Sequence, residues 1–307
     1  MLNPLVSVII PNYCHARYLD ERIRSVLNQT YQEFEVIILD DCSQDEGASR
    51  AVIEKYRGNP HVSHIVYNEI NSGSPYKQWA KGVSLSKGEL LWIAESDDYA
   101  DEHFLEALVP QFEKYENVSV AFCRSILFNE DGDIGPAYPK NIEERIYDGS
   151  DFIRRYCILK TGIVNASSAI FRKDIYWSLS DIYTTFKGAA DKLFWVLVAE
   201  KGNVAFVEKP YNHFRQHTNN TTTKLRKIGL NQIEDKRIYD YLCEKGHIRK
   251  DEQFSVKYNF LKERVFEMYT DSEIQQKIYK VWRWNRFLQL YMRLRVWYDN
   301  FLNMFFK

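Results

Sequence analysis

The sequence predicts an α/β protein in which a mostly parallel sheet carries helices on both faces and a helical extension follows. Two observations carry this prediction. Over roughly the first 223 residues, short uninterrupted runs of β-branched and other apolar residues alternate with segments of helical periodicity. Beyond that point only the helical periodicity remains. We therefore expect a first domain at 1–223 and a helical extension at 224–307.

The first half of the expected domain, about 1–98, alternates strictly between strand and helix. Strands buried on both faces are expected where apolar residues run without interruption, and helices where they recur every three or four positions. In chain order, strands are expected at 5–10, 34–39, 65–67 and 89–94, with helices between them over 19–27, 48–56 and 76–85. This alternation predicts a parallel sheet.

The second half, about 99–223, has a less regular pattern. A helix is expected at 102–115, which Pro110 should kink or split. A strand at 118–122 and a hairpin-type turn at 129–133 follow. The remaining expected elements are a strand at 163–171, a helix at 189–201, and strands at 204–207 and 211–214 that Pro210 separates.

Composition and charge exclude several classes of protein. The 307 residues are 45% hydrophobic, and 41 basic residues nearly balance 42 acidic ones, which argues against a nucleic-acid partner. The five cysteines have no paired spacing, so we expect neither disulfides nor a zinc site, and a cytoplasmic location. We expect no secretory leader and no membrane-spanning segment, because no apolar run approaches about 18 residues.

Polar residues follow four of the expected strands directly, at 11–13, 40–41, 68–73 and 95–98. The carboxyl ends of parallel strands meet at one edge of a sheet, where ligands bind. Asp and Asn are also common in turns after strands, because their side chains accept local hydrogen bonds. Four such segments at one edge favour a ligand pocket. The carboxylates at 95–98 would also resist ionising side by side unless a cation lay nearby.

Five ordered motifs resemble those of the family 2 glycosyltransferases, chiefly bacterial polysaccharide enzymes: VSVIIPNYCHARYLDERIRSVLNQTYQEFEVIILDDCSQD, NSGS, KGELLWIAESDD, AADKLFW and FRQH. The resemblance covers roughly residues 5–222. It implies a Rossmann-like GT-A fold and an inverting transfer of a sugar from a nucleotide-sugar donor to a hydroxyl of a saccharide or lipid-linked saccharide. Uridine is the expected base, by family frequency.

The resemblance also implies a metal site for Mg²⁺ or Mn²⁺ in the acidic motif. Asp98 is expected to be the direct ligand, with Asp97 on the ribose or the sugar, and hard oxygen donors suit these metals. Arg215 is expected at the diphosphate and His217 in the metal shell. Two local alternatives stay open: either aspartate caps the following helix, and His217 is a structural histidine.

The donor-binding residues implied by the resemblance are Pro11, Asn12, Tyr13, Asp40, Asp41, Asn71, Gly73, Lys77, Asp97 and Arg215. The first three are expected to wrap the base and ribose, and Asp41 to form a hydrogen bond with one of them. Gly73 permits a close backbone approach, and Lys77 takes the place of a family arginine. For Asn12 and Tyr13, roles in a turn and in the core stay open.

The expected general base is Asp191. An inverting transfer needs a group that removes the proton of the acceptor hydroxyl while its oxygen attacks the anomeric carbon. The resemblance assigns this role to Asp191, near the start of the helix at 189–201, and a helix N-cap is the alternative. Two other functions stay open: a sugar-phosphate nucleotidyltransferase, whose glycine-rich basic signature is absent after the first strand, and an inert scaffold that binds nucleotide sugars.

The C-terminal helical segment is basic and amphipathic. Residues 277–307 contain seven basic residues and one acidic residue, a net charge of +6. Six apolar residues recur at spacings of four and three, namely Phe287, Tyr291, Leu294, Tyr298, Phe301 and Phe305. Three partners for this stripe stay open: the inner face of an anionic cell membrane, the catalytic domain, or a second subunit in a homodimer.

Overall fold

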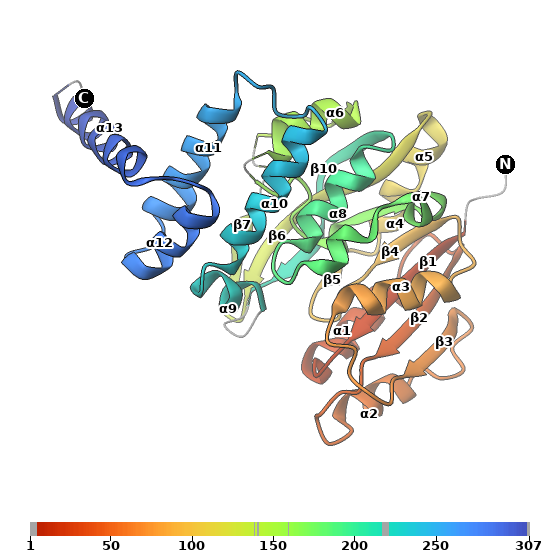
Figure 1. Ribbon diagram of the computed structural model, residues 1–307. Helices are drawn as coiled ribbons and strands as arrows, with labels where there is room; N and C mark the ends of the chain where they lie inside the picture. The colour runs from red at the N-terminus through yellow and green to blue at the C-terminus, as the bar shows by residue number, and fades with distance from the viewer. Residues whose placement is uncertain (1–4, 138, 140, 159, 217–220, 306–307) are drawn as a thin grey trace. The chain divides into compact units, whose positions relative to one another are not determined.

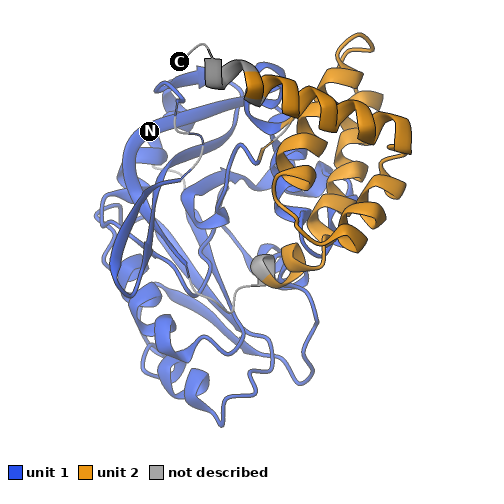
Figure 2. Cartoon of the chain, turned by 90° about the vertical axis from the view of Figure 1, so that its left-hand side faces the viewer, with its two compact units in different colours: residues 1–157, 161–217 blue, residues 158–160, 218–307 orange. Residues whose placement is uncertain are grey.

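The computed structural model describes residues 5–305 except 138, 140, 159 and 217–220, without the side chains of 221–223, 300 and 302–305. The chain divides into two compact units (Figure 2). The first unit comprises Met1–Cys157 and Thr161–His217, and the second comprises Ile158–Lys160 and Thr218–Lys307. The first is an α/β unit, and the second is helical.

The first half of the α/β unit confirms the expected alternation of strand and helix (Figure 1). Each expected element is present, with ends that differ by a few residues. In chain order the elements are β1 Val6–Asn12, α1 Ala16–Leu27, β2 Phe34–Asp40, α2 Ala48–Glu54, β3 Val62–Tyr67, α3 Pro75–Leu85 and β4 Leu90–Ile93.

The second half confirms the split helix. Pro110 is the first residue of a new helix, since its ring cannot continue the preceding one. The elements are β5 Tyr99–Ala100, α4 Phe104–Leu108, α5 Pro110–Lys114, β6 Val118–Asn129, β7 Gly132–Pro136, β8 Arg145–Tyr147, α6 Gly149–Phe152, the π-helical turn η1 Ile153–Cys157, the 3₁₀ turn η2 Ala166–Ser168, β9 Ala169–Arg172, α7 Lys173–Ser178, the 3₁₀ turn η3 Asp181–Thr185, α8 Ala190–Ala199 and β10 Asn203–Arg215.

Two expected strand assignments are wrong. Residues before β9 form the turn η2 instead of a strand, because the Asn165 side chain accepts a hydrogen bond from the Ser167 backbone N–H at 2.6 Å. In addition, Pro210 does not divide the last strand. β10 continues through it with register shifts at Val207/Pro210 and Pro210/Asn212, the kind of irregularity that accommodates a proline in a sheet.

The described strands form one mixed sheet in the order β3-β2-β1-β4-β9-β6-β10-β5, with β7 beside β6 and β8 beside β10. The first four strands are parallel, and β6 and β10 are parallel to each other. β9 is antiparallel to both β4 and β6, so β4, β6 and β10 point the same way. The predicted mostly parallel sheet is therefore confirmed.

Successive residues of β1 show why helices cover both faces of the sheet. Val8 and Ile10 belong to a core cluster that includes Leu19 of α1. Ile9 instead faces Gly82 of α3. Because side chains of a strand alternate between its two faces, burial of every residue of β1 requires a helix on each side.

The contact between α3 and β1 requires a glycine at position 82. A Cβ at this position would overlap Cγ2 of Ile9 and lie 2.9 Å from its Cγ1, and Ile9 is fully buried. We expect Gly82→Ala to lower the free energy of unfolding by about 1–3 kcal/mol, although alanine is the better helix former. Urea denaturation measures this change.

Ser84→Ala, at an exposed position of the same helix, is the matched control. It should change the free energy of unfolding by less than about 0.5 kcal/mol. If Gly82→Ala were equally neutral, α3 would not be held against β1 by close packing.

The helical unit has a hydrophobic core of its own. Its elements are α9 Thr221–Lys227, α10 Leu230–Glu244, α11 Gln253–Leu261, the π-helical turn η4 Lys262–Phe266, α12 Ser272–Val281 and α13 Arg286–Phe305. Trp282 is 1% exposed, stacks on Phe260 with ring centroids 4.5 Å apart, and donates its indole N–H to the Gln232 carbonyl at 2.8 Å. In the described part of the chain, no helix is both long and apolar enough to cross a membrane.

Candidate active site

The carboxyl ends of β1, β2, β4 and β10 meet at one edge of the sheet. β2 and β4 flank β1 on opposite sides, so the strand order reverses there, and this is the position where open α/β sheets bind ligands. Asn12 and Asp40 are register partners at the ends of β1 and β2. Arg215, the last residue of β10, donates its backbone N–H to Asp98, just beyond β4, at 3.0 Å. Four strands therefore contribute to one site.

The turns after β1 and β2 are tied together by side chains. Asn12 is 2% exposed and donates through Nδ2 to Asp40 Oδ1 at 2.7 Å and to Ser43 Oγ at 3.2 Å. The other oxygen of Asp40 accepts the Ser43 backbone N–H at 3.0 Å. Pro11 is buried within β1, whereas Tyr13 is 45% exposed. Of the expected residues after β1, Tyr13 is thus the one that presents a side chain to solvent at this edge.

Asp41 organises the loop between β3 and α3. Its side chain is 5% exposed, and its carboxylate accepts hydrogen bonds from Asn68 Nδ2 at 2.6 Å and from Gln78 Nε2 at 2.8 Å. Ser72 donates both its backbone N–H, at 2.9 Å, and its hydroxyl, at 2.7 Å. Three of these bonds end on Oδ1 and one, from the Ser72 hydroxyl, ends on Oδ2. The structure therefore shows Asp41 holding the loop, and its expected bond to the base or ribose stays a prediction.

The other expected residues of this loop lie within the same network. Asn71 donates to the Asp41 carbonyl at 3.1 Å and accepts the Gly73 backbone N–H at 2.7 Å. Gly73 has φ +72°, which a side chain would disfavour. Lys77, at the start of α3, donates to the Ser72 carbonyl at 3.0 Å. The structure thus brings Asp41, Asn71, Gly73 and Lys77 together.

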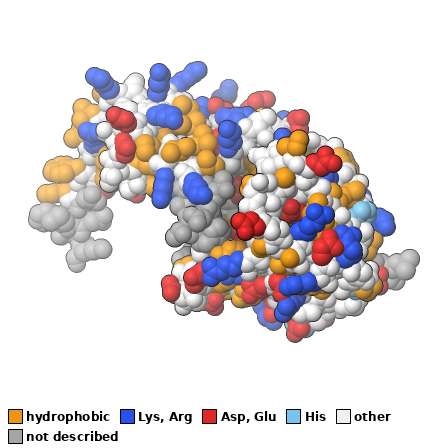
Figure 3. Space-filling model, turned by 90° about the horizontal axis from the view of Figure 1, so that it is seen from below, with side chains coloured by type: hydrophobic (Ala, Val, Ile, Leu, Met, Phe, Trp, Pro, Cys, Tyr) orange, Lys and Arg blue, Asp and Glu red, His pale blue; other side chains and the backbone are white. Residues whose placement is uncertain are grey.

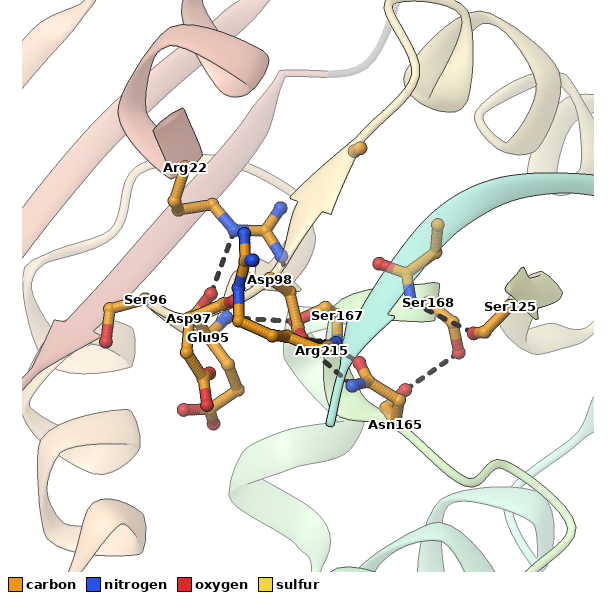
Figure 4. Close-up of polar contacts among 12 residues, drawn as sticks. Arg22, Glu95, Ser96, Asp97, Asp98, Ser125, Asn165, Ser167, Ser168 and Arg215 are labelled. Atoms are coloured by element: carbon orange, nitrogen blue, oxygen red, sulfur yellow. Dashed lines mark hydrogen bonds and ion pairs between the residues drawn. The ribbon is translucent and has the colours of Figure 1, made fainter. Parts of the chain in front are cut away.

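Asp98 is buried and engaged by protein donors (Figure 4). It is 1% exposed, and its Oδ2 accepts hydrogen bonds from Asn165 at 2.8 Å and Ser167 at 2.7 Å. Its Oδ1 accepts the Arg215 backbone N–H at 3.0 Å. Three protein donors thus engage Asp98 and tie the end of β4 to the turn η2 and to the end of β10. Its expected role as the direct metal ligand stays a prediction.

Arg22 lies beside this cluster, and the sequence motifs gave it no role. It is fully buried, donates through Nε to the Glu95 carbonyl at 2.9 Å, and lies 3.9 Å from Asp98 Oδ2. Burial lowers the pKa of the guanidinium, and the charge of Asp98 opposes that shift. A helical wheel could have found it, since Arg22 falls on the apolar face of α1 with Leu19 and Ile23.

Glu95 and Asp97 are the partly exposed carboxylates of the acidic motif. In Figure 4 their side chains point away from Asn165 and Ser167. Burial raises the pKa of Glu95 to about 8, the charge of Asp97 adds to the shift, and a 2.9 Å hydrogen bond from the Trp79 indole opposes it. The pKa of Asp98 is raised to about 6 by burial and by Asp97. A cation at this edge would relieve the repulsion among these groups.

Arg215 is held firmly at the acidic edge. Its guanidinium lies over the rings of Tyr18, at 4.5 Å, and Phe128, at 4.4 Å, and it forms an ion pair with Glu21. Its Nε donates to the Asp97 carbonyl at 2.8 Å. Arg215 therefore fixes the main chain of the acidic motif and keeps a positive charge beside it.

Asp191 lies in the first turn of α8 and is partly exposed. The N-cap of this helix is Ala189, so the alternative of an Asp191 N-cap is wrong. Phe194, three residues later and on the same side of the helix, lies with its ring 5.4 Å from that of Trp79, which bonds to Glu95. These contacts place the first turn of α8 near the acidic edge.

The expected metal shell is only partly represented in the structure. His217 lies outside the described residues. Within the described ranges, no three carboxylate, imidazole or thiol groups converge in a way that could hold a metal ion.

Asn165 and Ser167 form a second part of the site that the sequence analysis did not assign. Both are buried, and both donate to Asp98. The signal was the small polar run Asn165-Ala-Ser-Ser inside an expected apolar strand. Buried polar residues need hydrogen-bond partners. Here the side chains of the run form hydrogen bonds with Asp98 and with the backbone of the run itself.

Comparisons with known proteins find similar sequences. The family model "Glycosyl transferase family 2" matches residues 7–180. The poly(ribitol-phosphate) β-N-acetylglucosaminyltransferase TarP of Staphylococcus aureus is 32% identical over 196 residues, 62% of this chain and 56% of that protein. The glycosyltransferase GlyG of Streptococcus pneumoniae is 32% identical over 113 residues, which cover 37% of this chain and 36% of GlyG. The matches thus span about half or less of these relatives.

Solved structures show the same fold. Residues 1–349 of S. aureus TarS, in complex with UDP-GlcNAc, superpose with a TM-score of 0.68 at 20% identity, covering 90% of this chain and 79% of that one. The mannosyltransferase PcManGT of Pyrobaculum calidifontis, in complex with GDP-Man and Mn²⁺, gives a TM-score of 0.57 at 14% identity, covering 95% and 86%. The expected GT-A fold is therefore confirmed.

Proposed function

The chain belongs to glycosyl transferase family 2, and from this premise we propose that it transfers a sugar, with inversion, from a nucleotide-sugar donor to a hydroxyl of a saccharide or lipid-linked saccharide. The observation that carries the proposal is the acidic edge at the end of β4. Glu95 and Asp97 are partly exposed there, in the position where the strand order reverses. Besides burial, the charge of Asp97 raises the pKa of Glu95, and a cation at this edge would relieve that repulsion.

We assign the direct contact with Mg²⁺ or Mn²⁺ to Asp97 in place of Asp98. Asp97 is partly exposed and lies two residues from Glu95, whereas Asp98 is 1% exposed and accepts three hydrogen bonds from protein donors. A single carboxylate suits these metals when a diphosphate supplies further oxygens. When bound, the ion would neutralise the negative charge that grows on the departing nucleoside diphosphate. Arg215 lies beside this position and adds a fixed positive charge.

In the proposed transfer, Asp191 accepts the proton of the acceptor hydroxyl. The hydroxyl oxygen forms a bond to the anomeric carbon while the bond from that carbon to the diphosphate oxygen breaks, so the nucleoside diphosphate leaves with both electrons of that bond. Attack from the face opposite the leaving group inverts the anomeric centre. The position of Asp191 near the acidic edge, through Phe194 and Trp79, supports this role.

The donor half of the site comprises the loop that Asp41 holds and the end of β1. Tyr13 offers an exposed ring for a base to stack on, and Gly73 permits close approach of the loop backbone. We propose uridine as the base, in line with the UDP-GlcNAc complex of TarS. The acceptor would be a cell-surface polysaccharide or its precursor; TarP is, by its name, a poly(ribitol-phosphate) transferase. The five free cysteines fit a cytoplasmic reaction.

Removal of divalent metal is expected to abolish turnover. The purified chain, offered a panel of UDP- and GDP-sugars with Mn²⁺, should release free nucleoside diphosphate. Excess EDTA should lower that rate at least about tenfold, and added Mn²⁺ should restore it, because the leaving diphosphate needs a neutralising charge. A rate unchanged by EDTA would contradict the metal-dependent proposal.

The same assay separates two rival functions. A sugar-phosphate nucleotidyltransferase would release inorganic pyrophosphate from a nucleoside triphosphate and a sugar phosphate. An inert scaffold would bind a nucleotide sugar, measurable by calorimetry, and release nothing in the presence of any acceptor. Either result would replace the proposed transfer.

A further inference from the structure

The helix α13 is anchored to the helical unit by one face only. Met292 is 1% exposed and belongs to the core of this unit, and Leu288 and Val296 pack against the same core. These residues recur every four positions, so they form one side of the helix. Over 20 residues, α13 extends for about 30 Å.

A second apolar face of α13 is exposed. We call it the exposed stripe, and it comprises Phe287, Leu290, Tyr291, Leu294, Trp297, Tyr298 and Phe301, which are between 42% and 75% exposed. At 3.6 residues per turn they span roughly a third of the helix circumference, and no charged residue falls within that arc. Such a face is larger than the scattered apolar residues of an ordinary surface.

Basic side chains border the exposed stripe on both sides. Arg286 and Arg293 lie along one border and Arg295 along the other, and all three are exposed. Asp299, the one acidic residue in 277–307, pairs with Arg295 at 3.3 Å. Figure 3 shows basic and hydrophobic side chains side by side over the helical unit.

The apolar surface continues from α13 onto α11. Tyr291 of the exposed stripe contacts Tyr258 edge to face, with ring centroids 5.9 Å apart. Phe254, one turn before Tyr258, is 52% exposed and stacks on it. The exposed stripe thus packs, through Tyr291, against aromatic residues of α11 in the same unit.

We propose that the exposed stripe docks on an anionic lipid bilayer, with α13 lying in the plane of the headgroups. Aromatic residues such as Trp297 and Tyr298 favour this depth, and arginines at the borders attract anionic headgroups. A second copy of the chain fits less well, because pairing two stripes would bring together two segments of net charge +6. The docking does not depend on the proposed transfer reaction.

Sedimentation of the full chain with lipid vesicles tests the proposal. Vesicles of equal parts phosphatidylcholine and phosphatidylglycerol should carry the protein into the pellet, and vesicles of phosphatidylcholine alone should carry much less. Raising the salt concentration should weaken binding to the anionic vesicles, because it screens the arginines. Equal binding to both vesicles, or binding to neither, would overturn the proposal.

Two matched pairs of variants locate the surface. Trp297→Gln should lower vesicle partitioning about tenfold or more, whereas Trp177→Gln, at a similarly exposed tryptophan of α7 (60% against 65%), should leave it unchanged. Arg286→Gln with Arg293→Gln should lower partitioning about fivefold for each charge removed. The paired control, Lys245→Gln with Lys250→Gln, changes exposed basic residues of the same unit that do not belong to α13.

The remaining outcomes are also decisive. If each variant bound like its control, the exposed stripe would not be the docking surface. If the chain were a dimer in light scattering that Trp297→Gln dissociated, without vesicle binding, a second copy would be the true occupant. Asp191→Asn should bind vesicles like the unchanged chain, so a failure of the proposed transfer would leave the docking result intact.

Discussion

Replacing Asp191 with asparagine is expected to lower the rate of sugar transfer about 10²–10⁴-fold while leaving donor binding within a factor of about two. Asparagine preserves the shape of the side chain in the first turn of α8 but cannot take up a proton at neutral pH. The rate of transfer to an acceptor is measured as the release of nucleoside diphosphate. Calorimetry with the donor measures binding.

The neighbouring position supplies the control for this substitution. Lys192 is buried in the same turn, and its backbone N–H donates to Asp191 Oδ1 at 2.8 Å. Lys192→Met keeps this backbone bond and should leave most of the transfer rate. An Asp191→Asn variant that binds donor and turns over normally would remove Asp191 from the role of base.

The two aspartates at the end of β4 are expected to behave in opposite ways. Asp98→Ala should lower the free energy of unfolding by about 3–5 kcal/mol, because it removes the buried carboxylate that pairs with Arg22 and accepts hydrogen bonds from Asn165 and Ser167. That loss is a large share of the roughly 5–15 kcal/mol that stabilises a typical domain. Chemical denaturation followed by tryptophan fluorescence measures it.

Asp97→Asn is the partner experiment. Asp97 is partly exposed, so the substitution should change the free energy of unfolding by less than about 1 kcal/mol. It should nevertheless lower metal-dependent transfer at least about tenfold and weaken the response to Mn²⁺. A stable Asp98→Ala variant whose transfer no longer responds to Mn²⁺, together with an Asp97→Asn variant that is stable and still responds, would make Asp98 the direct metal ligand.

The sheet could be predicted from sequence because its signals are local. β1, β2 and β4 are mainly apolar runs buried on both faces, with Ser7 and Glu35 as polar exceptions, and the polar residues at or just after their ends mark the edge of the sheet. Pro210 misled the prediction because the rule for prolines applies to regular strands. Here the partner strand β6 accommodates the irregularity through shifts of register.

The roles of neighbouring carboxylates could not be separated in the same way. Whether Asp97 or Asp98 faces the protein depends on donors far along the chain, Asn165, Ser167 and Arg215, which lie 67, 69 and 117 positions from Asp98. The same holds for Asp41, whose donors come from the loop before α3 and from α3 itself. A motif identifies which residues gather at the site, and tertiary contacts decide which of them remain available to a ligand.

The buried carboxylate of Asp98 makes three distant segments mutually dependent. One side chain bridges the end of β4, the turn η2 and the last residue of β10. A substitution that disturbs this carboxylate therefore changes the stability effect of substitutions in the other segments. Paired substitutions at Asp98 and Asn165, whose side chains bond directly, should therefore be strongly non-additive in double-mutant cycles. Single substitutions around Asp98 would seldom be tolerated unless a second substitution in a bonded segment accompanies them.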